Sequence, residues 1–572
     1  MRKYFLFITA YHSGFYRNNL IFWSYSVKEY SLATVWEHIA DQFGDQEALV
    51  HGSQRICWQQ FDQRAACLAT RLESAGIQRS SKVALYLHNC PQYLEGTFAA
   101  LKLGAAPVNV NYRYKETELT YVLSNSDAEA LIYGSEFAER VEAIADKLVN
   151  LKILIEVGDE AFASVNSAIT YADALSAPPL SRRKQNPDDL ILIYTGGTTG
   201  MPKGVMYKTG TLSHGFLAQA LTAEAPESPT PGSLIDVALK RASEPSRVRK
   251  LVPTPLMHGT GWNNSMNALT HGGCVITLPS DHFDPHQLWQ TLQEERATSL
   301  AIAGDAFARP LLEALDAASD TGNPYDISSL QEIVSSGAMW SASVKEDLLK
   351  YGDLYLIDAM AASEGVLGVQ ISCRGQTGET AKFEPLSATK VFTDDDKEIQ
   401  SGSGDIGKLA TSGSLPIGYY KDPEKTEKTF RVIDGVRYSF PGDYATVEAD
   451  GTITLLGRGS NCINTGGEKV FPEEVEEAVK THTAVTDCLV IGVPDERFGE
   501  RITAVVSLEQ GQVVTPETLA DHVRSQLAGY KVPRKFLVVD KVRRAPTGKP
   551  DYIWAHNVII SATQNGAATS AQ

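Results

Sequence analysis

The chain has 572 residues, of which 43% are hydrophobic and 21% charged, and its formal net charge is −17. This length predicts several domains, and the acidic balance without a long basic run argues against nucleic acid or an anionic membrane surface as the main partner. The seven cysteines are scattered and no apolar run reaches the ~18 residues of a spanning helix, so we expect a reduced, cytoplasmic protein without integral membrane association.

Most of the chain alternates strand-like and helix-like segments. After an extension at 1–29 that we expect to be poorly ordered, a helix is predicted behind Ser31, a buried strand at 82–89 and a helix at 91–104, with Pro first and Gly last. This rhythm is typical of βαβ units. The predicted fold class is therefore α/β, with a large N-terminal domain of βα subdomains and parallel-rich sheets over residues 30–457.

The sequence pattern changes near residue 457. Residues 458–460 are predicted to be a hinge, and 461–557 a small, mobile α+β domain at the C-terminal end. The remaining residues, 558–572, are predicted to be a solvated tail.

One run of glycine and threonine stands out, IYTGGTTGMPKG at 193–204. Glycine lets the backbone approach a ligand closely, and hydroxyls, backbone N–H groups and one lysine suit a polyphosphate. A flexible loop after a strand is the alternative, and Pro202 before the lysine excludes a Walker A loop. The predicted phosphate-binding residues are Thr195, Gly196, Gly197, Thr198, Thr199, Gly200 and Lys203.

Six motifs in order resemble those of the adenylate-forming superfamily, and their wording is similar to FadD-like, AMP-forming acyl-CoA synthetases. The resemblance covers about residues 30–557. Its motifs are YTGGTTGMPKGV, SSGAMW (335–340), DAMAASEG (358–365), SFPGDYA (439–445), GRGSNCINTGGEKVFPEEVEE (457–477) and RAPTGKPDY (544–552). The resemblance implies that ATP activates a carboxylic acid to acyl-AMP, and that CoA then takes the acyl group with release of AMP.

The resemblance also assigns roles to charged residues. Lys549 is the implied adenylation lysine, Glu364 the implied Mg²⁺ ligand, and Ser363 a hydroxyl donor to the α-phosphate, while Lys469 would face pyrophosphate or ATP. A carboxylate is already ionised at neutral pH, so this half-reaction needs charge neutralisation and positioning rather than a general base.

A second implied set would hold the nucleoside. Asp443 would accept hydrogen bonds from both ribose hydroxyls. Met360 stands where the family usually has an aromatic that stacks on adenine, and methionine can cover a ring face with less specific geometry. The full set is Ser336, Gly337, Ala338, Asp358, Met360, Asp443 and Arg458.

Four further residues concern the acid, the thiol and the hinge. His258 stands where amino-acid-activating relatives have an aspartate for the substrate ammonium, so an α-amino acid is disfavoured, and a packed core histidine is the alternative. Gly466 and Gly467 resemble the turn along which pantetheine slides in relatives. Ser460 is at the hinge position, which is commonly Asp or Lys.

Several properties stay open at this point. The acid is fatty, sterol-derived or aryl, and the oligomeric state is open, with a homodimer as one option. A carrier protein or luciferase-like oxidation as the fate of the acyl-adenylate, and a non-catalytic adenylate-binding protein, are the alternatives. The presence of Lys549 and Glu364 argues against the last of these.

Overall fold

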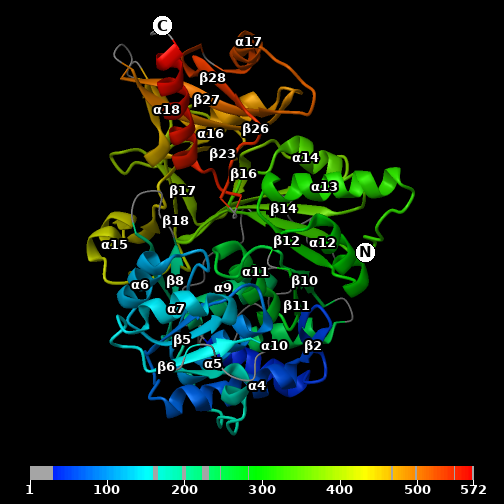
Figure 1. Cartoon of the computed structure of the whole chain (residues 1–572), viewed down its shortest axis with the longest axis vertical. Helices are drawn as coiled ribbons and strands as arrows, with labels where there is room; N and C mark the ends of the chain where they lie inside the picture. The colour runs from blue at the N-terminus through cyan, green and yellow to red at the C-terminus, as the bar shows by residue number, and fades with distance from the viewer. Residues whose placement is uncertain are drawn as a thin grey trace.

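The computed structural model describes residues 30–569, apart from 159–164, 166, 196–200, 222–230, 245–246, 281, 466–467, 496–498, 528 and 546–547. The predicted extension at 1–29, the phosphate-loop residues Gly196, Gly197, Thr198, Thr199 and Gly200, and the pair Gly466 and Gly467 therefore lie outside the described residues. Three sheets organise the described part of the chain (Figure 1).

An eight-stranded sheet is formed by the N-terminal part of the chain. Its strands are β3 (Lys82–Tyr86), β4 (Ala106–Asn109), β5 (Ala128–Gly134), β6 (Ile153–Val157), β7 (Ala168–Thr170), β8 (Leu190–Thr195), β9 (Lys203–Lys208) and β19 (Gly418–Tyr419). They run in the order β19-β9-β8-β4-β3-β5-β6-β7, and all pairs from β8 to β7 are parallel, as the βαβ rhythm predicts.

A fifteen-stranded sheet forms the middle of the molecule. Its strands are β1 (Glu47–His51), β2 (Gln54–Cys57), β10 (Arg249–Leu251), β11 (Cys274–Thr277), β12 (Ser299–Ile302), β13 (Glu332–Ser336), β14 (Tyr355–Ala362), β15 (Gly365–Ser372), β16 (Lys382–Pro385), β17 (Thr389–Phe392), β18 (Gly407–Thr411), β20 (Phe430–Ile433), β21 (Val436–Ser439), β22 (Asp443–Val447) and β23 (Ile453–Arg458). The pairs from β1 to β14 are parallel, and those from β14 to β20 are antiparallel. The antiparallel half departs from a parallel-rich expectation because connections as short as that from β14 to β15 leave no room for a crossover helix.

Helices cover these two sheets. Helix α3 (Leu32–Gln42) begins behind Ser31, whose hydroxyl accepts from the N–H of Ala33 at 3.2 Å, and α5 (Pro91–Leu103) ends at Gly104 with φ of 69°. The others are α4 (Trp58–Ser74), α6 (Glu116–Asn125), α7 (Ala138–Ala145), α8 (Tyr171–Leu175), α9 (Thr209–Leu221), α10 (Pro231–Ser243), α11 (Gly259–Thr270), α12 (Pro285–Glu295), α13 (Asp305–Asp320), α14 (Ala342–Leu348) and α15 (Pro423–Thr429). Short 3₁₀ turns are η1 (Ser135–Phe137), η2 (Gly459–Asn461) after the second sheet, and η3 (Gly529–Lys531) in the C-terminal part.

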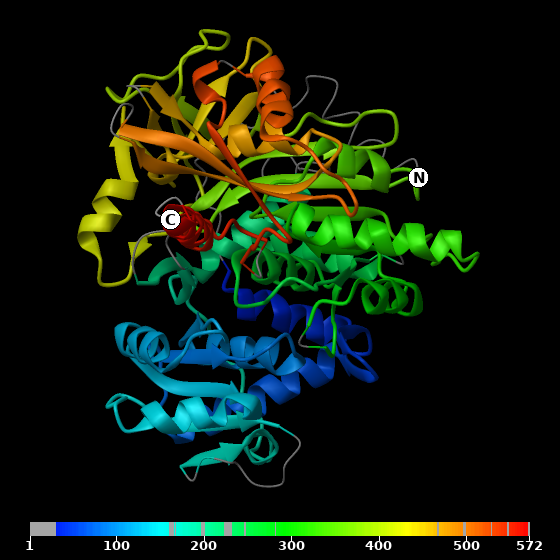
Figure 2. The same ribbon diagram turned by 45° about the horizontal axis from the view of Figure 1, so that its top comes forward.

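A third, five-stranded sheet belongs to the C-terminal part, which lies at one end of the molecule (Figures 1 and 2). Its elements are β24 (Ile463–Thr465), β25 (Glu468–Val470), α16 (Pro472–Lys480), β26 (Val485–Asp495), β27 (Gly499–Leu508), α17 (Pro516–Gln526), β28 (Lys535–Val539) and α18 (Tyr552–Thr569). A separate apolar cluster, with Val479, Val490 and Val523 among its buried members, joins α16 and α17 to this sheet.

The C-terminal end differs from the predicted solvated tail. Helix α18 continues through the predicted boundary at 557 to Thr569. Ala555 and Ile559, one helical turn apart, are buried with Leu489 and Val505 of the third sheet, which gives the helix an apolar surface to pack on.

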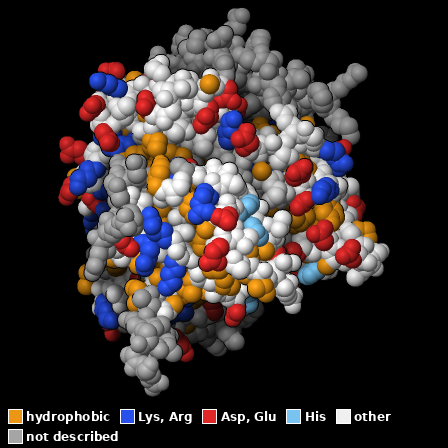
Figure 3. Space-filling view, turned by 90° about the horizontal axis from the view of Figure 1, so that it is seen from above, with side chains coloured by type: hydrophobic (Ala, Val, Ile, Leu, Met, Phe, Trp, Pro, Cys, Tyr) orange, Lys and Arg blue, Asp and Glu red, His pale blue; other side chains and the backbone are white. Residues whose placement is uncertain are grey.

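The surface carries mixed charge. On the face in Figure 3, acidic and basic side chains are interspersed rather than gathered by sign. Among the described residues, no helix is both long and apolar enough to cross a membrane.

Candidate functional site

The loop that carries Lys549 is closed by its own backbone and touches the large domain. The N–H of Ala545 donates to the carbonyl of Lys549, and the N–H of Gly548 to the carbonyl of Ala545, both at 2.8 Å. Gly548 has a φ of 77°, and a Cβ added to it would lie 2.8 Å from Ala306 Cβ and 2.9 Å from the Ala303 carbonyl oxygen. The small domain is therefore seated with this loop directly against the segment from β12 to α13.

Charged groups of the large domain and the hinge act on the ammonium of Lys549, which the small domain contributes. Burial among them lowers its pKa, and Arg458 lowers it further, whereas Glu364 and Asp443 act in the opposite direction. The residue nevertheless keeps contact with solvent. The structure thus brings together four residues that the motifs placed in one site from separate parts of the sequence.

Glu364 lies in the turn between β14 and β15. The hydroxyl of Tyr419 donates to its Oε1 at 2.5 Å, and the hydroxyl of Tyr207 donates to the carbonyl of Ser363 at 3.0 Å. Burial, and then the charge of Glu364, raise the pKa of both phenols, so they stay neutral donors. The two tyrosines fix the turn and leave further carboxylate lone pairs of Glu364 for a ligand.

Asp443 and Arg458 face each other across adjacent strands. They are register partners at the ends of β22 and β23, with Arg458 Nε 3.3 Å from Asp443 Oδ1. Burial opposes the charge of Arg458, but Asp443 and then Glu364 outweigh it and raise the pKa of the guanidinium. The guanidinium therefore stays charged, and the Asp443 carboxylate beside it is an acceptor that can bond ribose hydroxyls.

The predicted adenine segment follows β13. The hydroxyl of Thr260, from α11, lies 3.0 Å from Ser336 Oγ and donates to the Ser336 carbonyl at 3.1 Å. Gly337 has a φ of 86°, and a Cβ there would lie 3.1 Å from Thr260 Oγ1. Ala338 lies beside the docked loop, with its Cβ 3.5 Å from the Cβ position of Gly548.

Asp358 and Met360 point to the buried side of β14. The Asp358 carboxylate receives a hydrogen bond from Lys345 Nζ at 2.7 Å, and Lys345 is fully buried. Met360 is buried in a cluster with Leu367 and Phe383. Both side chains pack on the buried face of β14. The contact of each with the nucleotide stays a prediction.

The described ends of the glycine-rich run are Thr195 and Lys203, which are register partners of the antiparallel strands β8 and β9. Lys203 Nζ makes an ion pair with Asp422, just before α15. The two strands thus bring the described residues on either side of 196–200 together, and 196–200 themselves lie outside the described part.

His258 precedes α11 and lies near two cations. Burial, then Lys549, then Arg113 lower its pKa to about 3, so the ring is neutral at physiological pH, as the sequence predicts. This placement beside Lys549 puts His258 at the site, and the local positive potential does not favour a substrate ammonium.

Ser460 and Lys469, two residues of the predicted hinge motif, are placed by the secondary structure of their backbone. Ser460 is the middle residue of η2, immediately after β23, and Lys469 is in β25. Their side-chain contacts with a ligand stay predictions. Tyr207, Tyr419, Asp422 and Thr260 were not predicted, because hydrogen bonds between distant segments carry no local sequence signal.

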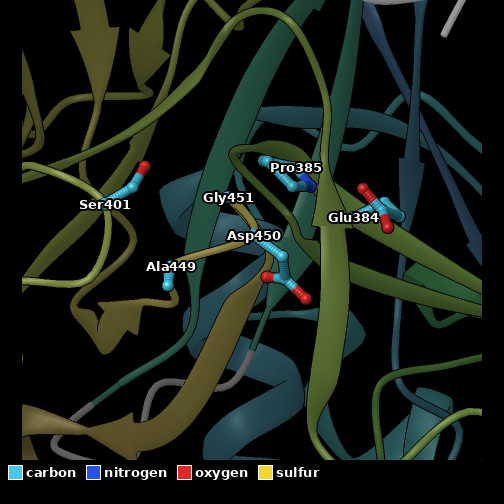
Figure 4. Close-up of a pocket in the computed structure, with 6 residues that line it drawn as sticks. All are labelled: Glu384, Pro385, Ser401, Ala449, Asp450 and Gly451. Carbon is cyan, nitrogen blue, oxygen red and sulfur yellow. The ribbon is translucent and has the colours of Figure 1, made fainter.

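A separate pocket of about 340 Å³ does not belong to this site (Figure 4). Glu384 and Asp450 contribute carboxylates to its lining, and Asp450 precedes β23 whereas Arg458 ends it. An acidic lining is unsuited to ATP. No group of three or more His, Cys, Asp or Glu side chains within the described residues is arranged to hold a metal ion by itself.

Comparison with known proteins gives consistent matches along most of the chain. Residues 36–420 match the AMP-binding enzyme family, and residues 474–549 match the AMP-binding enzyme C-terminal domain. The chain is 41% identical over 537 residues to a 3-oxocholest-4-en-26-oate–CoA ligase of Rhodococcus rhodochrous, which covers 92% of this chain and 95% of that protein.

A medium/long-chain-fatty-acid–CoA/3-oxocholest-4-en-26-oate–CoA ligase of Mycolicibacterium smegmatis is 40% identical over 538 residues, covering 92% of this chain and 96% of that one. Among solved structures, the anthranilate CoA ligase AuaEII in complex with anthranoyl-AMP has a TM-score of 0.79 at 22% identity, covering 94% of this chain and 98% of that one. This last likeness concerns the fold.

Proposed function

Since the chain belongs to the family of adenylate-forming AMP-binding enzymes and is an acyl-CoA ligase that uses ATP and CoA, we propose that its acids are medium- or long-chain fatty acids and steroids with a carboxylated side chain. The observation that carries the chemistry is the meeting of Lys549, Glu364, Asp443 and Arg458 at the domain boundary. The two relatives' names support the class of acid, and a neutral His258 beside Lys549 argues against amino acids.

In the first half-reaction, a substrate carboxylate oxygen attacks the α-phosphorus of ATP, and the bond to pyrophosphate breaks. The protonated Lys549 neutralises the charge on the carboxylate and the α-phosphate, which otherwise repel each other. Asp443 accepts from the ribose hydroxyls, and Lys203 with the glycine-rich run binds the outgoing phosphates. The hydroxyl of Ser363 donates a hydrogen bond to the α-phosphate.

Mg²⁺ fits this arrangement, because Glu364 offers a hard carboxylate oxygen and phosphates supply the other ligands that this ion usually has. When bound, it would neutralise phosphate charge. In the second half-reaction the CoA thiol attacks the acyl carbonyl, and the bond to AMP breaks. We propose that the small domain turns about residues 458–460 between the two steps, bringing Gly466 and Gly467 toward the thiol path.

The test of the substrate class is a panel of acids with ATP and CoA, read as AMP and acyl-CoA formed. It contains a 3-oxosteroid with its side-chain carboxylate at carbon 26, palmitate, octanoate, ferulate and alanine. We expect turnover with the first three. Higher kcat/KM for ferulate than for all three would contradict the proposed class, and exchange of pyrophosphate into ATP with alanine would contradict the role given to His258.

The test of the chemistry compares Lys549→Ala with Lys541→Ala, an exposed lysine eight residues earlier. Lys549→Ala should lower adenylation by about 10²-fold or more, as loss of one preorganised charge contact does, and spare thioester formation from presynthesised acyl-AMP. Lys541→Ala should leave both half-reactions unchanged. Equal losses in both half-reactions of Lys549→Ala would overturn the assignment.

A further inference from the structure

Arg544 ties the loop of Lys549 to the sheet of the small domain. Its Nε and Nη2 donate to the two carboxylate oxygens of Asp487, each at 2.6 Å, and its Nη1 donates to the carbonyl of Gly548 at 3.3 Å. Asp487 is in β26, so one planar side chain connects a strand with the residue before Lys549. A paired bidentate guanidinium holds a fixed geometry, which a lysine ammonium does not impose.

An acid of the large domain, Asp305, lies close enough to act on the charge of the same guanidinium. Asp305 begins α13 between Ala303 and Ala306, the two residues that approach Gly548. Its carboxylate accepts from the N–H of Ser341 at 2.9 Å and from Arg309 at 3.3 Å, which holds it in place at the domain boundary.

Electrostatics across the boundary agree with this geometry. Burial by itself lowers the pKa of Arg544, but Asp487, then Glu476 and Asp305, outweigh it and raise that pKa. Lys480, at the end of α16, is also under the influence of Asp305, although Glu477 is its nearer partner. Cations of the small domain therefore meet an anion of the large domain beside the lysine loop.

We propose that Arg544 is a positioning residue for Lys549: it shapes the lysine loop through Asp487 and Gly548, and with Asp305 it favours the seating of that loop for adenylation. The inference rests on the proposed role of Lys549. Arg544 and Asp487 move together because both belong to the small domain, so the loop keeps its shape in any domain orientation. The proximity to Asp305 exists only when the loop is seated.

The experiment measures single-turnover rates of each half-reaction for Arg544→Gln, Arg544→Lys and Asp305→Asn. The matched control is Arg543→Gln, since Arg543 is exposed and pairs with Asp551 at 3.4 Å. We expect Arg544→Gln to lower acyl-AMP formation by at least about 10-fold and to leave thioester formation from acyl-AMP within about 3-fold of the wild type. Arg544→Lys should recover part of the loss, and Asp305→Asn should lower acyl-AMP formation by about 3- to 10-fold.

A loss confined to one half-reaction separates positioning from general destabilisation, which would lower both. If Arg544→Gln changes neither half-reaction, or both equally, while Lys549→Ala abolishes adenylation, the inference is wrong and the proposed function stands. If Lys549→Ala leaves adenylation intact, the role proposed for Lys549 fails, and the inference about Arg544 fails with it. Should Arg544→Gln not fold, Arg544→Lys and Asp305→Asn decide: wild-type rates of acyl-AMP formation in both would overturn the inference.

Discussion

Gly548→Ala tests the seating of the small domain most directly, because the structure separates two costs of an added methyl group. The first cost is conformational, since Gly548 has a φ of 77°. A left-handed conformation costs an L-residue roughly 1–2 kcal/mol, and this strain is present in every orientation of the small domain.

The second cost arises from contact with the large domain. The new Cβ would lie 2.8 Å from Ala306 Cβ and 2.9 Å from the Ala303 carbonyl oxygen. Backbone on one side limits relaxation, and overpacking of this kind costs about 1–3 kcal/mol. This cost arises only in the orientation in which the lysine loop contacts the large domain. Acyl-AMP formation should therefore fall by about 5- to 150-fold relative to thioester formation.

The assay is single-turnover kinetics of the two half-reactions, started from acid with ATP and from acyl-AMP with CoA. Gly511→Ala is the matched control, because Gly511 is also in the small domain with a φ of 80°, but none of the described atoms lies within 4 Å of a Cβ added there. It should cost stability without separating the two rates. Equal changes of both rates in Gly548→Ala would refute the argument that this contact belongs to the adenylating orientation alone.

Three other predictions address the hinge and the titrating groups. Because proline fixes φ near −65°, Ser460→Pro should keep acyl-AMP formation near wild type and slow single-turnover thioester formation by at least about 10-fold; wild-type rates in both would remove Ser460 as the pivot. Burial and then Arg458 lower the pKa of Lys549 below 10.5, so pyrophosphate release should decline as pH rises toward that value, and Arg458→Gln should move the decline to higher pH; an unmoved pH profile would contradict this coupling. Burial, with Asp443 among the smaller causes, raises the pKa of Glu473 above 4.5, so the stability that its proton contributes is lost as pH rises through the folded-state pKa. The Tm of Glu473→Gln minus that of the wild type should therefore be about 2–4 °C larger at pH 9 than at pH 4. An equal Tm difference at both pH values would speak against a proton held by Glu473 in the folded state.

Local signals predicted the elements that position the site. Ser31 and Gly104 bound helices as their capping preferences indicate, and the apolar run before Thr195 is a strand. The motif residues Lys549 and Glu364 also meet, although 185 positions separate them, because the resemblance already contained their relation.

The sequence does not predict the hydrogen-bond and ion-pair partners that come from distant segments of the chain. Tyr419 reaches Glu364 from 55 residues away and Asp422 reaches Lys203 from 219, and neither tyrosine nor aspartate belongs to a pattern that names its partner. Helix α18 was missed for a related reason. Its polar, small residues resemble a tail, and the apolar surface that stabilises it belongs to β26 and β27.

The pair Asp443–Arg458 has a consequence for how a reactive intermediate is kept. Arg458 ends β23, and η2 with Ser460 follows at once. Points on an axis of rotation do not translate, so a small domain that turns about these residues leaves the ribose anchors almost where they were. The adenylate would stay bound through its ribose while the small-domain residues near its acyl phosphate are replaced by others. Leakage of acyl-AMP into water would then depend on the contacts that hold its nucleoside, those of Asp443 among them, rather than on the speed of the domain.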